Sequence, residues 1–315
     1  FSASTPLVIA LGGGRLMFLE YNLTGFQALK DAGIVAIDSD THLTSDGGVG
    51  LCHDATVDEM TTGTGAVTSF TTAGFQALDI DYPPNIPGFP APKAITHDQK
   101  VTQFGDTIIY APEVKASASA APLVTTLQNG NVAGERALIS SFTLSDLTGS
   151  GKALGEGYQA MLLAFTNNTG DLAAARTAGV QWAGVQSDTS DANFALWTAD
   201  FKTVAWTVNR RFRYDQLLAL GLYGVYTDDP IYLQAASTVY TDNFDSGKWQ
   251  PGMLHHSEPL NAGASVGERG ADRRGTILAG GWFGWSTTNT VSPHRDFVLQ
   301  GWATAPADNG NDDYV

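Results

Sequence analysis

The residues of this chain best suited to chemistry lie in one short stretch built from two apolar runs. The run 34–37 leads into Asp38 and Asp40, and the run 49–52 leads into His53. Residues two apart in a strand face the same side of a sheet, so the two carboxylates would point in one direction. Two carboxylates and an imidazole at neighbouring strand ends can hold a hard cation and act on a phosphate ester.

A second pair of ionisable residues, Glu113 and Lys115, comes at the end of a strand expected over 107–114. Together with Asp38 and Asp40, this pair gives three carboxylates, which suit an oxygen-ligated Ca²⁺ or Mg²⁺. A lysine beside them can contact a phosphate oxygen. No Cys/His spacing for zinc is found. Taken alone, the Asp-x-Asp pair leaves a plainer alternative open, in which the aspartates only form a turn.

Short apolar runs alternate with helical patterns over about the first 230 residues, and eight strands are counted. The expected strands are 5–11, the run carrying Asp38 and Asp40, 107–114, 136–142, 158–164, 180–186, 203–208 and 223–226. This rhythm predicts a (β/α)8 TIM barrel, with catalytic groups at the carboxyl ends of its strands. The main rival is a doubly wound open sheet, but the Gly12–Met17 stretch lacks the G-x-G-x-x-G loop typical of its nucleotide-binding members.

The predicted barrel covers residues 1–235 and contains one long irregular segment. This segment, at about 55–93, is rich in Thr, Gly and Pro and reads as an insertion after the second strand, of the kind used as a functional loop or lid. Over 236–315 the helical periodicity disappears, and Trp, Gly and short alternating runs indicate a sandwich-like all-β module. The sequence stops at Val315 without a closing turn, so this module is expected to be incomplete.

Composition excludes several kinds of partner. The net charge is −15, with 17 Lys and Arg against 32 Asp and Glu, which argues against nucleic acid and anionic membranes. No apolar stretch is long enough to insert into a membrane. The single cysteine, Cys52, is expected to be a packed strand thiol. The start at Phe1 and the low lysine content favour a mature or excised chain that is extracellular, secreted or virion-associated.

Several motifs of this chain, in order over residues 5–233, resemble those of the glycerophosphodiester phosphodiesterase (GDPD) family. They are Ile37-Asp-Ser-Asp40 with Leu43-Thr-Ser-Asp-Gly47, His53-Asp-Ala-Thr-Val-Asp58 with Thr61-Thr-Gly-Thr-Gly65, Glu113-Val-Lys115, Ser141-Phe142, and Trp206-Thr-Val-Asn209 with Gly224-Val-Tyr-Thr-Asp-Asp-Pro230. The resemblance implies a TIM barrel with a small insertion after the second strand.

The resemblance also implies roles for individual residues. The divalent cation falls on Asp38, Asp40 and Glu113, with Asp38 one methylene shorter than the family's usual Glu. Lys115 would contact the phosphate. His53 would be one of the family's two catalytic imidazoles. Trp206 would form an apolar wall for the glycerol, with packing in the core as the alternative.

The chain departs from the family pattern at the end of the first strand. The family has His-Arg-Gly there, and this chain has Leu11-Gly12-Gly13. Leucine cannot transfer a proton, and losing one member of a catalytic pair costs several orders of magnitude in rate. His42 and His97 are the two candidates to replace the imidazole, and Arg15 is the candidate to replace the arginine.

Two functions therefore stay open from the sequence. The first is a metal-dependent hydrolase of glycerol-phosphate esters, either deacylated lipids or polymers such as teichoic acid, with impaired activity. The second is a catalytically dead binding module of a phage tail or secreted adhesin, recognising a cell-surface glycan or glycerol-phosphate polymer. Assembly into a larger particle would involve the β module.

Overall fold

The computed structural model describes residues 6–81, 91–165, 172–209 and 211–234, and the short segments 266–269 and 274–277. The chain divides into two compact units, Phe1–Gln234 and Ala235–Val315. In the second unit, β10 (Val266–Arg269) pairs antiparallel with β11 (Arg274–Ile277). The other expectations for 236–315 lie outside the described residues.

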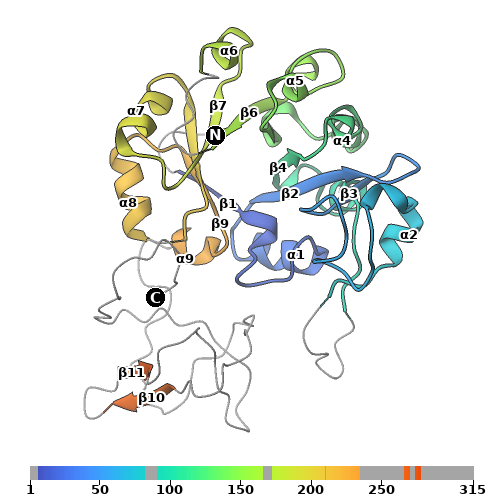
Figure 1. The fold of residues 1–315 in the computed structure, drawn as a ribbon, viewed down its shortest axis with the longest axis horizontal. Coiled ribbons are helices and arrows are strands. Elements are labelled where there is room, and N and C mark those ends of the chain that lie inside the picture. The colour runs from blue at the N-terminus through green and yellow to red at the C-terminus, as the bar shows by residue number, and fades with distance from the viewer. Residues whose placement is uncertain are drawn as a thin grey trace. The chain divides into compact units, whose positions relative to one another are not determined.

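In the first unit, eight parallel strands close into a barrel (Figure 1). They are β1 (Leu7–Ala10), β2 (Ala36–Leu43), β4 (Ile109–Val114), β5 (Leu138–Ser141), β6 (Gln159–Ala164), β7 (Trp182–Gln186), β8 (Lys202–Trp206) and β9 (Gly224–Thr227). Strand β1 pairs with β9 on one side and with β2 on the other, so the barrel wall has no open edge. The TIM-barrel prediction is confirmed, and the doubly wound alternative is wrong, because an open sheet would end in two edge strands, whereas here the first and last strands of the parallel series pair with each other.

Side chains alternate between the barrel interior and the helical layer. The interior is filled by Ile9, Ala36, Ala111, Leu138, Met161, Leu163, Trp182, Val204 and Tyr226. Ala36 belongs to this set, whereas Ile37 packs in the outer core. With a period of two, Asp38 and Asp40 follow Ala36 on the inward face, toward the carboxyl end of β2.

Helices surround the barrel. They are α1 (Leu23–Asp31), α3 (His97–Phe104), α4 (Ala120–Asn129), α5 (Leu144–Leu147), α6 (Leu172–Thr177), α7 (Asp191–Asp200), α8 (Arg211–Ala219) and α9 (Pro230–Gln234). Asn22 is the N-cap of α1, and its side chain accepts a hydrogen bond from the Gly25 amide. Ser190 is the N-cap of α7, and Asp191 opens the first turn, where its negative charge interacts favourably with the helix dipole.

The segment after the second barrel strand is more regular than its composition indicates. Strand β3 (Val49–Leu51) pairs antiparallel with β2, and the helix α2 (Thr72–Ala77) lies within the insertion. The expectation of no helix at 55–93 is therefore wrong, since six residues are too few to show a helical period. The Asp46 carboxylate accepts hydrogen bonds from the hydroxyls of Thr44 and Thr72, which fastens the β2–β3 turn to the start of α2.

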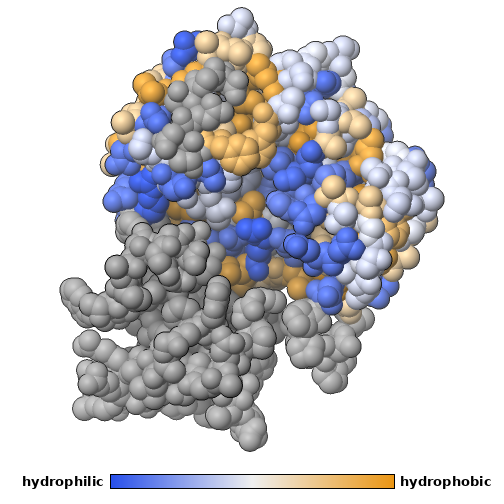
Figure 2. All heavy atoms as spheres, in the orientation of Figure 1, coloured by the Kyte–Doolittle hydropathy of each residue, from blue (hydrophilic) through white to orange (hydrophobic). Residues whose placement is uncertain are grey.

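Figure 2 shows hydrophilic residues gathered in a band across the middle of the face drawn, with apolar residues beside it. None of the described helices is long and apolar enough to span a bilayer.

Candidate active site

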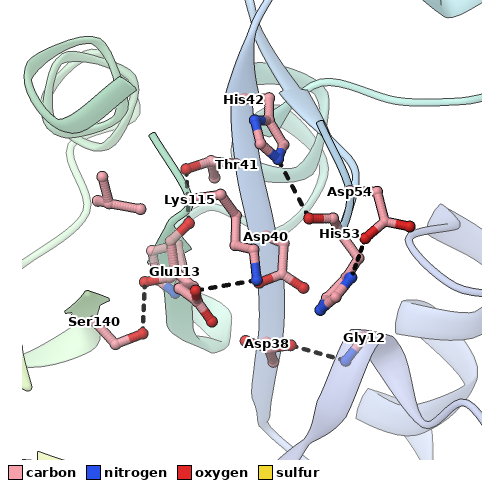
Figure 3. A network of polar contacts seen from close by, with 12 residues as sticks. Gly12, Asp38, Asp40, Thr41, His42, His53, Asp54, Glu113, Lys115 and Ser140 are labelled. Carbon is pink, nitrogen blue, oxygen red and sulfur yellow. Dashed lines mark hydrogen bonds and ion pairs between the residues drawn. The ribbon is translucent and has the colours of Figure 1, made fainter. Parts of the chain in front are cut away.

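The acidic residues of β2 and β4 meet at the carboxyl end of the barrel (Figure 3). Asp38 and Asp40 are buried, with 2% and 3% of their surfaces exposed. The ladder between β2 and β4 places Asp40 beside Glu113. The period-two argument therefore holds, since one face of two neighbouring strands presents all three carboxylates to the same region.

Each carboxylate of this acidic cluster (Asp38, Asp40 and Glu113) is fixed by a different partner. The Gly12 amide donates a hydrogen bond of 2.9 Å to Asp38 Oδ2. The Tyr21 hydroxyl donates to Asp40. The ammonium of Lys115 lies 3.2 Å from Glu113 Oε1 and 3.8 Å from Asp40 Oδ1. These partners come from the segment after β1, which carries Gly12 and Tyr21, and from Lys115 directly after β4.

The charges of this cluster perturb one another. Burial, and then the neighbouring Asp40 carboxylate, raise the pKa of Glu113 to about 7 and raise the pKa of Asp38. Burial works to lower the pKa of Lys115, but Asp40 and Glu113 outweigh it and the pKa is raised. Lys115 thus stays positive at neutral pH, whereas Asp38 and Glu113 hold a proton more readily than isolated carboxyl groups do.

The donor chemistry of the cluster fits a hard divalent cation, because all three residues offer carboxylate oxygens. The buried hydroxyl of Tyr226 has no hydrogen bond of regular geometry with a described residue, although the Ser140 hydroxyl partly offsets the rise in its pKa. Within the described ranges, however, no three His, Cys, Asp or Glu side chains are spaced to hold a metal ion. The metal set Asp38, Asp40 and Glu113 therefore stays a prediction.

His53 follows β3 at the edge of the acidic cluster, and its side chain is about half exposed. Its Nδ1 lies 2.8 Å from Asp54 Oδ1, which leaves Nε2 for proton transfer. The ring nitrogen Nε2 of His42 lies 3.3 Å from the backbone carbonyl of His53 and holds that segment to β2. His42 is thus a support for His53.

Trp206 ends strand β8 and packs with two phenylalanines that follow β5 and β6. Its ring centroid lies 5.7 Å from that of Phe142 and 6.1 Å from that of Phe165, both edge to face. Phe142 and Phe165 stack at 4.6 Å, and Phe165 is 58% exposed. This exposed aromatic cluster lies at the carboxyl ends of the strands, where a substrate would bind. The predicted wall for glycerol at Trp206 stays a prediction.

A cavity of about 590 Å³ lies at the other end of the barrel and contains none of these residues. It is lined by Pro6, Leu7, Val8, Val35, Ile109, Glu135, Arg136, Trp182, Tyr214, Tyr223 and Gln234. Most of these residues lie at the amino-terminal ends of the strands, and active sites of this fold form at the carboxyl ends, so we place the site at the acidic cluster.

Comparison with known proteins decides the family. The family model described as "Glycerophosphoryl diester phosphodiesterase family" matches residues 12–232, which is more than two thirds of the chain. This chain belongs to the GDPD family. No curated protein matches it.

Solved structures of GDPD proteins share its fold at low sequence identity. A phosphodiesterase from Oleispira antarctica, in complex with the product sn-glycerol-3-phosphate, is 18% identical with a TM-score of 0.60, and the match covers 73% of this chain and 96% of that one. For a glycerophosphodiester phosphodiesterase from Agrobacterium tumefaciens the identity is 15%, the TM-score 0.59 and the coverage 74% and 100%. For one from Thermotoga maritima they are 18%, 0.57, and 72% and 96%.

This GDPD chain carries a short 3-10 turn, Leu11–Gly13, at the end of its first strand, and the departure from the family's first histidine that the sequence predicts there stays a prediction. Leu11 is partly buried against the side chains of the barrel interior. The substitute His97 is wrong, because it is fully buried on α3, with Nδ1 2.6 Å from the Thr126 hydroxyl and its ring packed near Tyr110. The rings of His42 and His97 are thus both engaged in holding the fold.

Arg15, the predicted substitute for the GDPD arginine, lies beside Gly12 but is already paired. Its Nε donates to Asp228 Oδ1 at 2.6 Å, and Nη1 lies 3.5 Å from Glu20 Oε1. Asn209 donates to the other oxygen of Asp228. The side chain of Arg15 is 38% exposed, so part of its guanidinium still faces solvent.

Lys100, which was not predicted from the sequence, supports strand β2 of this GDPD barrel from the helical layer. Lys100 is fully buried on α3, and its ammonium donates to the carbonyls of Ile37 and Asp38 and to the Ser39 hydroxyl at 3.0–3.1 Å. Phe26 lies under the ammonium, 4.7 Å away. The available signal was a lysine on the apolar face of a helix.

Replacing Lys100 with methionine should change how stability depends on pH. Burial lowers the pKa of Lys100 to about 7, partly opposed by Asp38 and Asp40. Between pH 7 and 10 the unfolded chain therefore binds more protons at this site than the folded chain. The free energy of unfolding of the wild type should rise with pH there, by at most about 1.4 kcal/mol per pH unit, relative to the variant.

Urea unfolding at pH 7, 8 and 9 measures this difference. Lys93→Met, which removes an exposed lysine paired with Asp79, serves as the control and should follow the wild type. Parallel curves for wild type and Lys100→Met would show that Lys100 does not titrate as described.

Proposed function

We propose that this chain hydrolyses glycerophosphodiesters to an alcohol and glycerol phosphate, using a divalent cation held by Asp38, Asp40 and Glu113. The observation that carries the proposal is the meeting of these carboxylates with Lys115 at the carboxyl end of a GDPD barrel. The relative from Oleispira antarctica was solved with its product sn-glycerol-3-phosphate, which supports the same product class here.

Each residue has a defined task in this reaction. Lys115, oriented by Glu113 and Asp40, places a positive charge on the phosphoryl oxygens and stabilises the charge that develops there. The cation would add Lewis-acid polarisation of the phosphoryl group. His53, with Nδ1 directed to Asp54, gives a proton to the departing alkoxide. Trp206 provides an apolar surface for the glycerol carbons.

The substrate class extends in our proposal to glycerol-phosphate polymers such as teichoic acid. His53 and Phe165 are both more than half exposed, so the reacting groups are open to a long chain rather than enclosed. The net charge of −15 would repel an anionic polymer, and a bound Ca²⁺ or Mg²⁺ would offset part of that repulsion at the site.

Removal of divalent cations should abolish turnover, because the three carboxylates would then repel the phosphate. The assay measures sn-glycerol 3-phosphate released from glycerophosphocholine and from teichoic acid, after chelation and again after adding Ca²⁺ or Mg²⁺. Asp40→Asn should lose the response to cation, whereas Asp79→Asn, at an exposed carboxylate, should keep it. Full activity in chelator would contradict the proposed cation.

The binding-module function is favoured only by Leu11 at the end of β1. It predicts that the chain binds glycerophosphocholine or teichoic acid without releasing product at any cation concentration. The release assay separates the two functions directly.

A further inference from the structure

We propose that Glu20 is a second acid–base residue of this site and does the work of the imidazole that Leu11 cannot do. This inference rests on the proposed hydrolase function. Glu20 lies in the loop between the turn Leu11–Gly13 and α1. A Cβ built on Gly12 would lie 3.4 Å from Glu20 Oε1, which places this carboxylate beside the end of β1.

The surroundings of Glu20 suit proton transfer. Its side chain is 29% exposed, so a water molecule can reach it, and Arg15 Nη1 lies 3.5 Å from Oε1. The charged groups that act on it are Arg15, Asp40 and His53. Burial raises its pKa, Arg15 and His53 lower it, Asp40 raises it, and the result is a raised pKa. A carboxylate with a raised pKa is a better base at neutral pH.

The other carboxylates described around the acidic cluster already have partners there, Glu113 with Lys115 and Asp54 with His53. Asp38 accepts the Gly12 amide and is 2% exposed. Asp40 is held by the Tyr21 hydroxyl and lies near Lys115. Both belong to the proposed cation site. Glu20, in the described loop after β1, is a partly exposed carboxylate that the proposed cation site does not use.

The proton transfers then balance. Glu20 takes a proton from a water molecule as the water oxygen forms a bond to phosphorus. The bond between phosphorus and the alcohol oxygen breaks, and the electron pair stays on that oxygen. Protonated His53 gives it a proton. The products are the free alcohol and glycerol phosphate, and both residues return to their starting states by exchanging protons with solvent.

Glu20→Gln keeps the size of the side chain and an oxygen for Arg15 but cannot accept the proton. We expect kcat for glycerophosphocholine to fall by about 100- to 10,000-fold, with KM little changed. The acidic limb of the pH–rate profile should also disappear. Glu59→Gln, at an exposed position in the insertion, is the matched control and should keep wild-type kcat. Thermal unfolding of both variants verifies that they fold.

A second variant tests the substitution directly. Adding Leu11→His to the Glu20→Gln variant should raise its kcat by a larger factor than Leu11→His raises the kcat of the wild type. Wild-type kcat and an intact acidic limb in Glu20→Gln would overturn the role of Glu20 while leaving the hydrolase function standing. A wild-type chain that releases no alcohol from glycerophosphocholine or teichoic acid would overturn both.

Discussion

Replacing His53 with alanine should lower kcat for glycerophosphodiester hydrolysis by about 100- to 10,000-fold, the usual contribution of a general acid. The imidazole is about half exposed and lies at the edge of the acidic cluster, so its loss removes a proton donor without opening the core. The measurement is the release of sn-glycerol 3-phosphate under saturating substrate and cation.

Two comparisons show whether this loss is chemical. The free energy of unfolding of His53→Ala should lie within about 0.5 kcal/mol of the wild type, because the side chain is at the surface. Asp54→Asn keeps the imidazole and removes only the carboxylate at its Nδ1, so its loss in kcat should be smaller. Unchanged turnover in His53→Ala would assign the leaving-group proton to another residue.

Replacing Leu11 with histidine should raise kcat most strongly in the Glu20→Gln variant, by at least about 100-fold there, because it supplies an imidazole at the end of β1 where the carboxylate base has been removed. Leu11 is only partly buried, so a ring of similar size can be placed there without a large cavity or clash. Steady-state kinetics of Leu11→His and Leu11→Asn separate an imidazole effect from that of a merely polar side chain. Equal rates for the two variants would contradict the prediction.

Gly12→Arg should not be combined with that change. Gly12 has φ of +56°, in the left-handed region, and a Cβ there would lie 3.0 Å from Arg15 Cγ. The backbone alone would cost about 1–2 kcal/mol for a non-glycine residue. The single Leu11→His variant is therefore the better test of whether the site otherwise retains its catalytic parts.

Much of this arrangement followed from local patterns. The alternation of strands and helices predicted the barrel, and the two-residue spacing of Asp38 and Asp40 predicted that they share a face. The short helix α2 was missed because it has too few residues to show a period. Contacts between distant segments carry no local pattern. The pairing of Arg15 with Asp228 joins residues 213 positions apart, and the sequence around Arg15 does not predict it.

The closure of the barrel also affects how the chain folds during its synthesis. Strand β1 pairs with β9, so the first strand completes its hydrogen bonding only after residue 227 has been synthesised. Until then β1 and the most recently made strand both present bare backbone donors and acceptors, which favour association with other chains. Such long-range pairing slows folding. A nascent or truncated chain ending before β9 is thus the form of this protein most exposed to aggregation and to capture by chaperones.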